Sequence, residues 1–490
     1  MASDEPPRLV EETLSFELAA SVPLPPPPSS AAMHAARVPH AAMQDAHFAA
    51  AAADVAAAKS GIDGVSDRDW RQARDVVFPL DRSGVSSDVG ASLFHNRAGH
   101  KLHQTMQTTA MWPSILAYLD AARAARRPAP LATTALTAVA AAAPASPAAG
   151  DGDDAAADGG APGLKKRRTE AKKGRHQPTH GIAPHCVRPH ELTFLDVCGG
   201  PGAFSQLLFN TKPKKKIKLE GFGLTLMDEH VGAPAGWYPE LPEKHGFGAC
   251  FGVDGTGNIY DPANVEAFVS LVRDRPVRLV VADGGFEVPP SEMNLQEALM
   301  ARITFAQFYV ALRTLKSGGC FVLKLFDVFT TFNASMLFLC CFFWRRVVIV
   351  KPQHSRAVNS ERYLACLGFR GADEGDADAS ARAAWLLHLK DVHASGFTDN
   401  TAVGSLVDPA ALGADAPFWA AMAGMNTTLA GRQQRAIDLV LRQVAAHAAS
   451  RDAVTAAAVR VATGGHGAEK VLAVDATGEK AKTEGQLGRW

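Results

Sequence analysis

One short stretch, residues 192–208, limits what this chain can fold into more than any other part of the sequence. It reads LTFLDVCGGPGAFSQLL. Residues 192–197 are mostly apolar and favour a β-strand. Glycines follow at positions 199, 200 and 202, and apolar residues then recur at helical spacing. Because glycine has no Cβ, the backbone can approach a bound molecule, and the first amides of the helix point towards it. The stretch therefore predicts a ligand-binding turn between a buried strand and a helix.

The glycine spacing narrows the class of ligand. It matches neither the dinucleotide pattern GxGxxG nor the phosphate-binding loop GxxxxGK[ST], which weakens an NAD or ATP site. A tight strand-to-helix turn without a ligand is the alternative, because short glycine patterns also occur by chance.

Composition excludes several classes of protein. The 490 residues include 50 basic and 50 acidic side chains, so any attraction to nucleic acid must be local. Seven cysteines without a CxxC pair disfavour a zinc site and a disulfide framework, and indicate a reduced intracellular compartment. The N-terminus opens with acids and prolines, unlike a signal peptide. The strongest apolar run, residues 335–344, is shorter than the roughly 20 residues that span a bilayer, so we expect a core helix and no membrane segment.

Short β-favouring runs alternate with helical patterns after the glycine turn. This alternation predicts an α/β fold with a doubly wound, parallel-centred sheet. Ligands of such sheets bind at the carboxyl ends of the strands, where the strand order reverses. We expect strands at residues 221–226, 249–253, 277–282, 319–323, 347–350 and 361–367, and helices at residues 262–274, 294–315 and 333–344.

Composition also divides the chain into segments. Residues 1–60 are rich in proline and alanine and offer little to bury, so we expect a disordered leader. Residues 123–184 contain few large apolar side chains and are expected to form an inserted linker. The remaining segments are residues 61–122 and 185–372 as the two parts of the folded domain, 373–450 as a helical extension and 451–490 as a loose tail.

Two basic clusters indicate contacts outside the folded core. The insertion ends in KKRR at residues 165–168, which reads as a nuclear import signal, an RNA-backbone contact or a solubilising charge run. A second cluster at residues 211–218 follows the glycine turn, near the ligand-binding edge of the sheet. It is the better RNA candidate, because lysine and arginine make most contacts to phosphate.

A lysine at the end of an apolar strand is a candidate catalytic group. Lys324 lies in FVLKLF, and burying an unpaired ammonium is costly. Asp283 ends the preceding strand, and Glu361 begins a strand that we expect at the edge of the sheet. A purely structural pair between Lys324 and Asp283 is the alternative. Lys101, taken alone, is more typical of a solvated lysine than of a catalytic one.

Six blocks of sequence together resemble a known family. DVCGGPGAF resembles the first motif of S-adenosylmethionine-dependent methyltransferases of the RrmJ/FtsJ type. With the other five blocks, the chain resembles the cap-specific mRNA nucleoside-2′-O-methyltransferases of that family, the cap-1 type in particular. The resemblance implies a Rossmann-like methyltransferase sheet with helical flanking segments, and it covers roughly residues 62–118 and 190–370. The other blocks are FHNRAGHK at 94–101, VADGGF at 281–286, NLQE at 294–297, KLFD at 324–327 and SRAVNSERY at 355–363.

The resemblance implies a catalytic Lys-Asp-Lys-Glu tetrad formed by Lys101, Asp283, Lys324 and Glu361. Lys324 would take the proton of a ribose 2′-hydroxyl. An ordinary lysine pKa of ~10.4 opposes this, but the neighbouring cation Lys101 and partial desolvation favour the neutral amine. The two carboxylates would orient the two lysines.

The resemblance also implies a cofactor and a substrate. S-adenosyl-L-methionine is the implied cofactor, with Asp228 as the nearest acid for the adenosine ribose, and capped mRNA is the implied substrate. Gly200 and Ala203 depart mildly from the family pattern, which more often has alanine and glycine there. The implied cofactor contacts are Asn96, Cys198, Gly199, Gly200, Pro201, Gly202, Ala203, Phe204, Asp254 and Asp283, and the implied RNA contacts are Asn294, Arg356 and Asn359, with Arg71 and Arg74 as weaker candidates for the cap.

The leading hypothesis is therefore methyl transfer to the 2′-oxygen of the first transcribed nucleotide of capped mRNA. The alternatives are cap-2, ribosomal RNA or transfer RNA 2′-O-methylation, and an inert RNA-binding subunit. The presence of all four tetrad residues speaks against the inert subunit. We expect no metal and a nuclear location, with a cytoplasmic or virus-associated one as the alternative. The capping or transcription machinery is an expected partner. No G-patch, WW or guanylyltransferase-like module is apparent, which leaves recruitment to the transcript unexplained.

Overall fold

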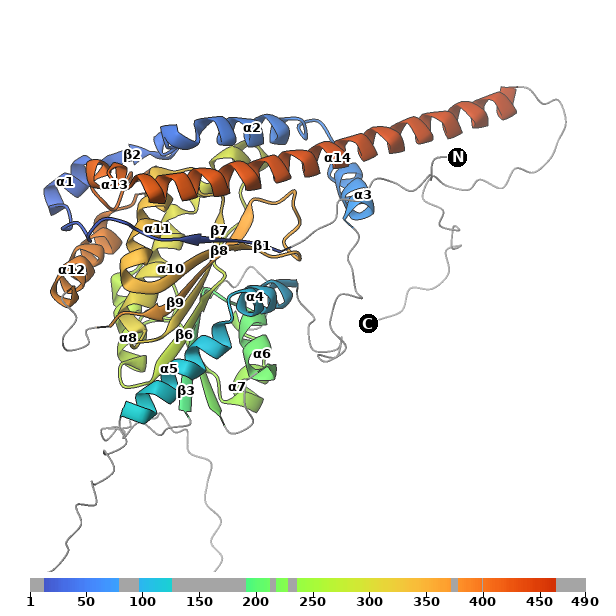
Figure 1. Ribbon diagram of the computed structural model, residues 1–490. Coiled ribbons are helices and arrows are strands. Elements are labelled where there is room, and N and C mark those ends of the chain that lie inside the picture. Colours follow the sequence, from blue (N-terminus) through green and yellow to red (C-terminus); the bar gives the residue numbers. More distant parts are fainter. Residues whose placement is uncertain are drawn as a thin grey trace, which may run out of the picture.

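The computed structural model describes residues 13–78, 97–125, 191–211, 217–227, 236–371, 378–398 and 400–463. Through these residues runs an eight-stranded mixed sheet with helices on both faces (Figure 1). The expected doubly wound α/β architecture is confirmed. In spatial order the strands are β1 (Leu14–Leu18), β8 (Trp344–Lys351), β9 (Glu361–Phe369), β7 (Cys320–Phe326), β6 (Val277–Ala282), β3 (Glu191–Val197), β4 (Lys218–Leu224) and β5 (Gly248–Cys250).

The parallel half of the sheet contains the point where strand order reverses. β3 is followed on one side by β4 and β5, and on its other side lie β6 and β7, all paired in parallel. The reversal therefore falls between β3 and β6, and a crevice at their carboxyl ends is where such sheets bind ligands.

The antiparallel half corrects one expectation. β9 pairs with β7 on one side and with β8 on the other, so Glu361 begins an internal strand and not an edge strand. The sequence of β9 is apolar along most of its length, and all but two of its residues are buried. A strand covered on both faces is expected to read this way, whereas an edge strand is usually charged or short.

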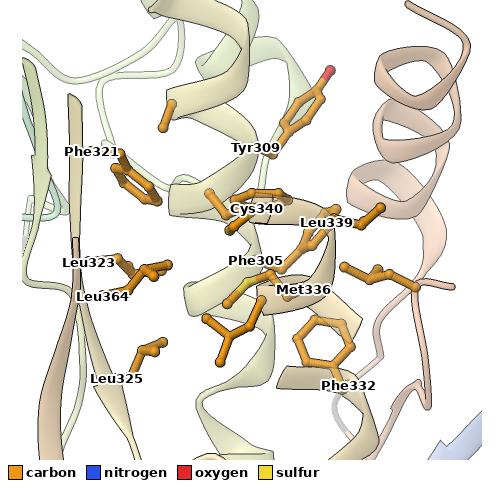
Figure 2. Close-up of a cluster of buried hydrophobic side chains, with 14 of the residues drawn as sticks. Phe305, Tyr309, Phe321, Leu323, Leu325, Phe332, Met336, Leu339, Cys340 and Leu364 are labelled. Carbon is orange, nitrogen blue, oxygen red and sulfur yellow. The ribbon is translucent and has the colours of Figure 1, made fainter. Parts of the chain in front are cut away.

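Two helical layers cover the sheet. Figure 2 shows one of them, where Phe305 and Met336 lie between β7, with Phe321 and Leu323, and Phe332 on the far side of the cluster. The apolar run at 335–344 is confirmed as a core helix up to Phe343, where α11 ends, whereas Trp344 begins β8. Burial on nearly all sides explains why this helix lacks a polar face. This layer contains α8 (Pro262–Val272), α10 (Ala301–Thr314), α11 (Thr331–Phe343) and α12 (Ala379–Ser395), and the other contains α4 (Arg97–Thr108), α5 (Met111–Ala125), α6 (Ala203–Asn210) and α7 (Glu240–His245).

The expectation of a disordered leader over residues 1–60 is wrong for its described part, which begins at Thr13. β1 adds an antiparallel edge strand to β8. A few apolar side chains anchor the rest of this segment: Met33, Phe48 and Val55 are each at most 2% exposed. The average composition of residues 1–60 does not reveal these three anchoring side chains, because most of the residues around them are alanine. The elements after β1 are α1 (Ser30–Ala35), β2 (Arg37–Pro39), η1 (His40–Ala42), η2 (Ala46–Phe48) and α2 (Ala49–Ser60).

A long C-terminal helix, α14 (Ala416–Thr463), crosses the molecule beside α2 and α3 (Asp67–Val77) (Figure 1). The expected loose tail over 451–490 is therefore wrong as far as Thr463. The insertion from 126 to 184 and the basic residues 212–216 lie outside the described residues, and the proposed domain boundaries stay predictions. The remaining elements are η6 (Pro290–Leu295), α9 (Gln296–Leu299), β10 (Thr401–Val403) and α13 (Pro409–Gly413).

Candidate active site

Four separate elements bring the predicted tetrad together. Lys101 lies on α4, Asp283 directly follows β6, Lys324 lies in β7, and Glu361 begins β9. β6 and β7 are paired up to Ala282 and Leu323, so the next residues, Asp283 and Lys324, are neighbours. Lys324 is opposite Tyr363 in the antiparallel pair of β7 and β9. Because side chains alternate between faces along a strand, Glu361, two residues before Tyr363, points to the same face as Lys324.

The four side chains form two close pairs. The Lys101 ammonium lies 2.6 and 2.8 Å from the two carboxylate oxygens of Glu361. The Lys324 ammonium lies 3.3 Å from Asp283 Oδ1 and donates to the Asp283 carbonyl oxygen at 2.7 Å. All four side chains are between 12% and 21% exposed, so the cluster is largely buried but open to solvent on one side.

The two carboxyl groups differ electrostatically. Burial raises the pKa of Asp283, and the charge of Lys324 only partly offsets this effect. Burial also raises the pKa of Glu361, but the charge and hydrogen bond of Lys101 outweigh it and leave that pKa below its ordinary value. Glu361 is thus the more strongly ionised of the two carboxyl groups. The charges of Lys101 and Glu361 also act on the pKa of Asp283, and the charge of Lys324 acts on that of Glu361.

The predicted glycine turn joins β3 to α6 as expected. Gly202 has a φ of 109°, and a Cβ at Gly200 would lie 2.6 Å from the Gly236 carbonyl oxygen. These two positions therefore require glycine. Cys198 lies where the strand order reverses. Gly284, which lies two residues after β6, is so close that a Cβ added to it would lie 2.9 Å from the Cβ of Cys198. The turn and the tetrad thus lie side by side at the carboxyl edge of the sheet.

Beneath the turn, Asp196 is fully buried. Its Oδ2 accepts hydrogen bonds from the Ser205 amide at 3.1 Å and the Ser205 hydroxyl at 2.6 Å. Burial raises the pKa of Asp196 to about 7, against a lowering by Ser205. These hydrogen bonds join the end of β3 to the first turn of α6 and so fix the glycine turn between them.

The surface next to the turn suits a ligand with an apolar face. Leu226 and Val253, just beyond β4 and β5, are 56% and 68% exposed, although they lie at the carboxyl edge of the sheet. The loops that contain them are joined by a hydrogen bond from the Met227 amide to the Thr256 carbonyl oxygen at 2.7 Å. Exposed large apolar side chains on neighbouring loops mark a candidate binding surface. The residues present therefore fit the adenosine part of the implied cofactor.

The other predicted cofactor residues occupy different environments. Cys198, Gly199 and Pro201 line the turn, and Asp254 lies on the same edge, where its carboxylate accepts hydrogen bonds from the amide and hydroxyl of Thr256. Phe204 is 1% exposed, and its ring packs 6.3 Å from that of Tyr363, so its side chain belongs to the core. The buried Ala203 likewise leaves only its main chain for a ligand, and Asn96 and Asp228 lie outside the described residues.

The predicted RNA contacts fall into two groups. Arg74 and Arg356 both reach Asp75, at 3.1 and 3.0 Å, and Arg71 pairs with Asp67 one turn earlier on α3. Asn359 is exposed on the loop before β9. Asn294 is exposed in η6, where it lines a cavity of about 170 Å³ together with Lys59 and Asp327.

Sequence reasoning missed several side chains around the tetrad. The hydroxyl of Tyr363 donates to Asp283 Oδ1 at 3.3 Å, and Tyr363 is fully buried. Lys351 and Arg362 are buried below the loop before β9, with hydrogen bonds into it. Arg362 and Tyr363 stood within a recognised block, but only their three-dimensional partners assign them a place at the site.

The described residues contain neither a candidate membrane span nor a candidate metal site. None of their helices is long and apolar enough to cross a membrane. Within the same residues, no group of three or more His, Cys, Asp or Glu side chains is arranged to hold a metal ion.

The chain is similar in sequence to a family of known proteins. A model of the FtsJ-like methyltransferase family matches residues 182–369. A Trypanosoma brucei brucei protein named cap-specific mRNA (nucleoside-2′-O-)-methyltransferase 1 is 36% identical over 388 residues, which cover 79% of this chain and 83% of that protein. Its Trypanosoma cruzi namesake is 35% identical over 79% of this chain and 84% of that protein. The Bos taurus protein of the same name is 41% identical over 194 residues, 37% of this chain and 22% of that protein. At this identity and coverage, the chain belongs to the FtsJ-like methyltransferase family.

Proposed function

We propose that this chain transfers a methyl group to the 2′-oxygen of the first transcribed nucleotide of capped mRNA. The enzyme class and the cofactor follow from the family, whose members are S-adenosylmethionine-dependent methyltransferases. The substrate follows from relatives that are named for this activity and aligned along most of their length. The single observation that supports the reaction most is the cluster of two lysines and two carboxylates beside the glycine turn.

Lys324 is the general base in this proposal. The cofactor supplies an electrophilic methyl group when bound, and the ribose hydroxyl must lose its proton as its oxygen attacks. Lys324 points from the end of β7 into the crevice and takes this proton on its Nζ atom when the amine is neutral. Asp283 holds the Lys324 amine from two sides, through its carboxylate and its carbonyl oxygen. This fixes the direction of the base, which matters because a small misplacement of reacting groups is costly in rate.

Glu361 and Lys101 have a supporting role in the same proposal. Their short pair places a positive charge next to Lys324 without leaving either ion unpaired in a largely buried site. Asn294, Arg356 and Asn359 then contact the RNA, with Arg71 and Arg74 nearer the cap. The exposure of Asn294 in η6 and of Asn359 on the loop before β9 supports this path.

The substitution Lys324→Ala tests the catalytic assignment. We expect kcat for methyl transfer to capped RNA to fall by about a hundredfold or more, because general-base catalysis contributes factors of this size. Cofactor affinity, measured by calorimetry, should stay unchanged. Lys316→Ala is the matched control, since Lys316 donates to the Arg273 carbonyl oxygen, beyond the amino-terminal end of β7. If Lys324→Ala retains the activity of this control, Lys324 is not the base.

Two further parts of the proposal concern the cell. The KKRR cluster at residues 165–168 supports a nuclear location, and a fluorescent fusion in which these residues are replaced by alanine would lose nuclear enrichment if it is the import signal. Recruitment to transcripts would then depend on the capping or transcription machinery. A fusion that stays nuclear after this replacement would contradict the role of the cluster.

A further inference from the structure

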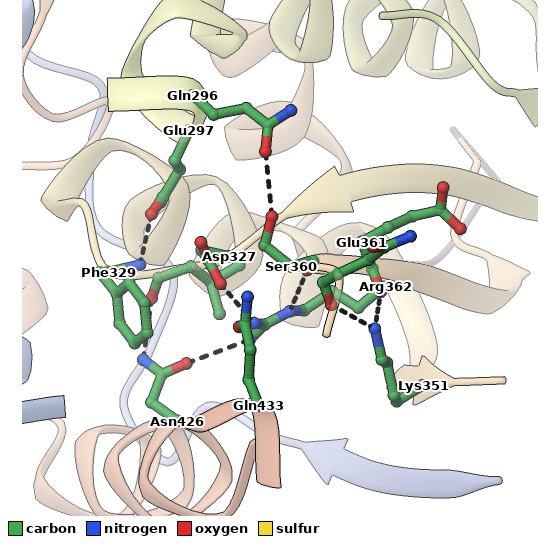
Figure 3. Close-up of polar contacts among 12 residues, drawn as sticks. Gln296, Glu297, Asp327, Phe329, Lys351, Ser360, Glu361, Arg362, Asn426 and Gln433 are labelled. Atoms are coloured by element: carbon green, nitrogen blue, oxygen red, sulfur yellow. Dashed lines mark hydrogen bonds and ion pairs between the residues drawn. The ribbon is translucent and has the colours of Figure 1, made fainter. Parts of the chain in front are cut away.

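A buried lysine lies directly behind the candidate active site. Lys351 ends β8 and is only 5% exposed. Its ammonium donates to the Glu361 carbonyl oxygen at 2.7 Å (Figure 3). It also donates to the Asn359 carbonyl oxygen at 2.6 Å and to the Ser355 hydroxyl at 3.0 Å. An ammonium has three N–H donors, so all of them are used. The Ser355 hydroxyl also lies 2.9 Å from the Glu361 carbonyl oxygen, which closes the network.

A fold-stabilising role alone does not account for a lysine at this position. Burial lowers the pKa of Lys351 to about 7, and the charge of Glu361 raises it again only in part. Replacing a buried charge with an apolar side chain of similar volume is often neutral or stabilising. What the ammonium provides, and an apolar side chain cannot, is a set of three directed hydrogen bonds into one loop.

That loop contains two residues of the proposed site. Asn359 is exposed on it, and Glu361 ends it with a carboxylate 2.6 Å from the Lys101 ammonium. Other anchors hold the neighbouring positions, since Gln433 donates to the Val358 carbonyl oxygen at 3.1 Å. Lys351 is the side chain that holds both the Asn359 and the Glu361 carbonyl oxygens. Its removal would leave the Asn359 carbonyl oxygen without this donor, and the Glu361 carbonyl oxygen with the Ser355 hydroxyl as its side-chain donor.

We propose that Lys351 is a positioning residue for methyl transfer, which sets the Glu361 carboxylate against Lys101 and holds Asn359 along the RNA path. This inference rests on the proposed function. Lys351 acts from behind the loop, through main-chain atoms, and contacts neither the RNA nor the cofactor. Its effect therefore reaches the tetrad and the RNA together, and leaves the cofactor turn between β3 and α6 unchanged.

The substitution Lys351→Met tests the inference, since it keeps the apolar stem and removes the three donors. We expect kcat per cofactor-binding site to fall by about 10- to 100-fold, the scale expected for misplaced catalytic groups. KM for capped RNA should rise, and the cofactor dissociation constant should stay within twofold of the wild-type value. A merely structural role would reduce the number of cofactor-binding sites and leave kcat per site and KM unchanged.

Arg382→Met is the matched control. Arg382 is a cation that is 4% exposed and donates to the Gly371 carbonyl oxygen at 3.2 Å, beyond the other end of β9. We expect this variant to keep wild-type kcat per site and KM. If Lys351→Met does not fold, Ser355→Ala removes one donor to the Glu361 carbonyl oxygen, and we expect the same changes at smaller size. If the wild-type protein transfers no methyl group to capped RNA, the proposed function is contradicted. If the wild-type protein is active but the Lys351 variant has the same kcat per site and KM as Arg382→Met, this inference alone is overturned.

Discussion

The buried ion pair between Arg362 and Asp327 provides a sharp test of how the site is held. Arg362 Nη2 lies 2.8 Å from Asp327 Oδ1, and the two side chains are 3% and 7% exposed. Asp327 has a φ of 53°, a left-handed conformation that is uncommon for a residue other than glycine. Arg362 also donates to the Ser360 carbonyl oxygen at 3.2 Å, so one guanidinium joins the loop after β7 to the loop before β9 (Figure 3).

The expected cost of Arg362→Met follows from this burial. Removing one partner of a buried ion pair costs about 3–5 kcal/mol, because the other charge is left uncompensated. Lys59 lies 3.4 Å from Asp327 Oδ2 and still offsets part of that charge, so the lower end of the range applies. We expect a loss of about 3 kcal/mol in the free energy of unfolding, or roughly a hundredfold in the folding equilibrium.

Urea unfolding followed by tryptophan fluorescence measures this loss. The double variant Arg362→Met, Asp327→Asn removes both charges of the pair, and asparagine also tolerates the left-handed conformation. It should be less destabilised than the sum of the two single variants, by about 1 kcal/mol or more for residues in direct contact. A loss below about 1 kcal/mol for Arg362→Met, or strictly additive effects, would refute the view that this pair holds the two loops.

Three further predictions concern individual side chains. Burial raises the pKa of Asp196 from 3.8 to about 7, so protonated Asp196 stabilises the folded state at low pH, and this stabilisation is lost as the pH rises to 7. Asp196→Asn should therefore flatten the pH dependence of the unfolding free energy between pH 4 and 7. An unchanged slope would contradict this. Glu361→Gln removes the charge that pairs with Lys101 and should lower kcat, measured by radiolabel transfer, by about tenfold or more. Cofactor affinity, measured by calorimetry, should stay unchanged. A wild-type kcat would rule out a role of this ion pair in the reaction. Arg71 has a side chain that is 66% exposed, so Arg71→Gln should weaken RNA binding and reduce the slope of log affinity against log salt by about 1, measured by fluorescence anisotropy; an unchanged slope would exclude a phosphate contact.

Local sequence pattern was sufficient for the centre of the fold. The strand-turn-helix around Gly199–Gly202 depends on neighbouring residues, so its pattern is visible without the rest of the chain. The pairing of Asp283 with Lys324 could be expected because each directly follows the last paired residue of two adjacent parallel strands. The approach of Lys101 and Glu361 could not be expected from spacing, since 260 residues separate them. The family resemblance supplied that part of the tetrad.

The parts that were missed depend on long-range partners. β1 is a five-residue strand in a proline- and alanine-rich segment, and its pairing with β8 is what makes it a strand. The internal place of β9 follows from the order in which strands pair, which no local pattern encodes. Lys351 is an ordinary basic residue in the sequence, and it becomes informative only when its three hydrogen bonds are seen.

The most direct test of the central claim is the position of the methyl group on a defined RNA. Two RNAs of identical sequence, one capped and one with a 5′-triphosphate, would be incubated with the enzyme and labelled S-adenosylmethionine, then digested with nuclease to locate the label. We predict label on the 2′-oxygen of the first transcribed nucleotide of the capped RNA, and its loss with Lys324→Ala. Equal labelling of both RNAs, or label at another nucleotide, would contradict a cap-specific activity at the first position.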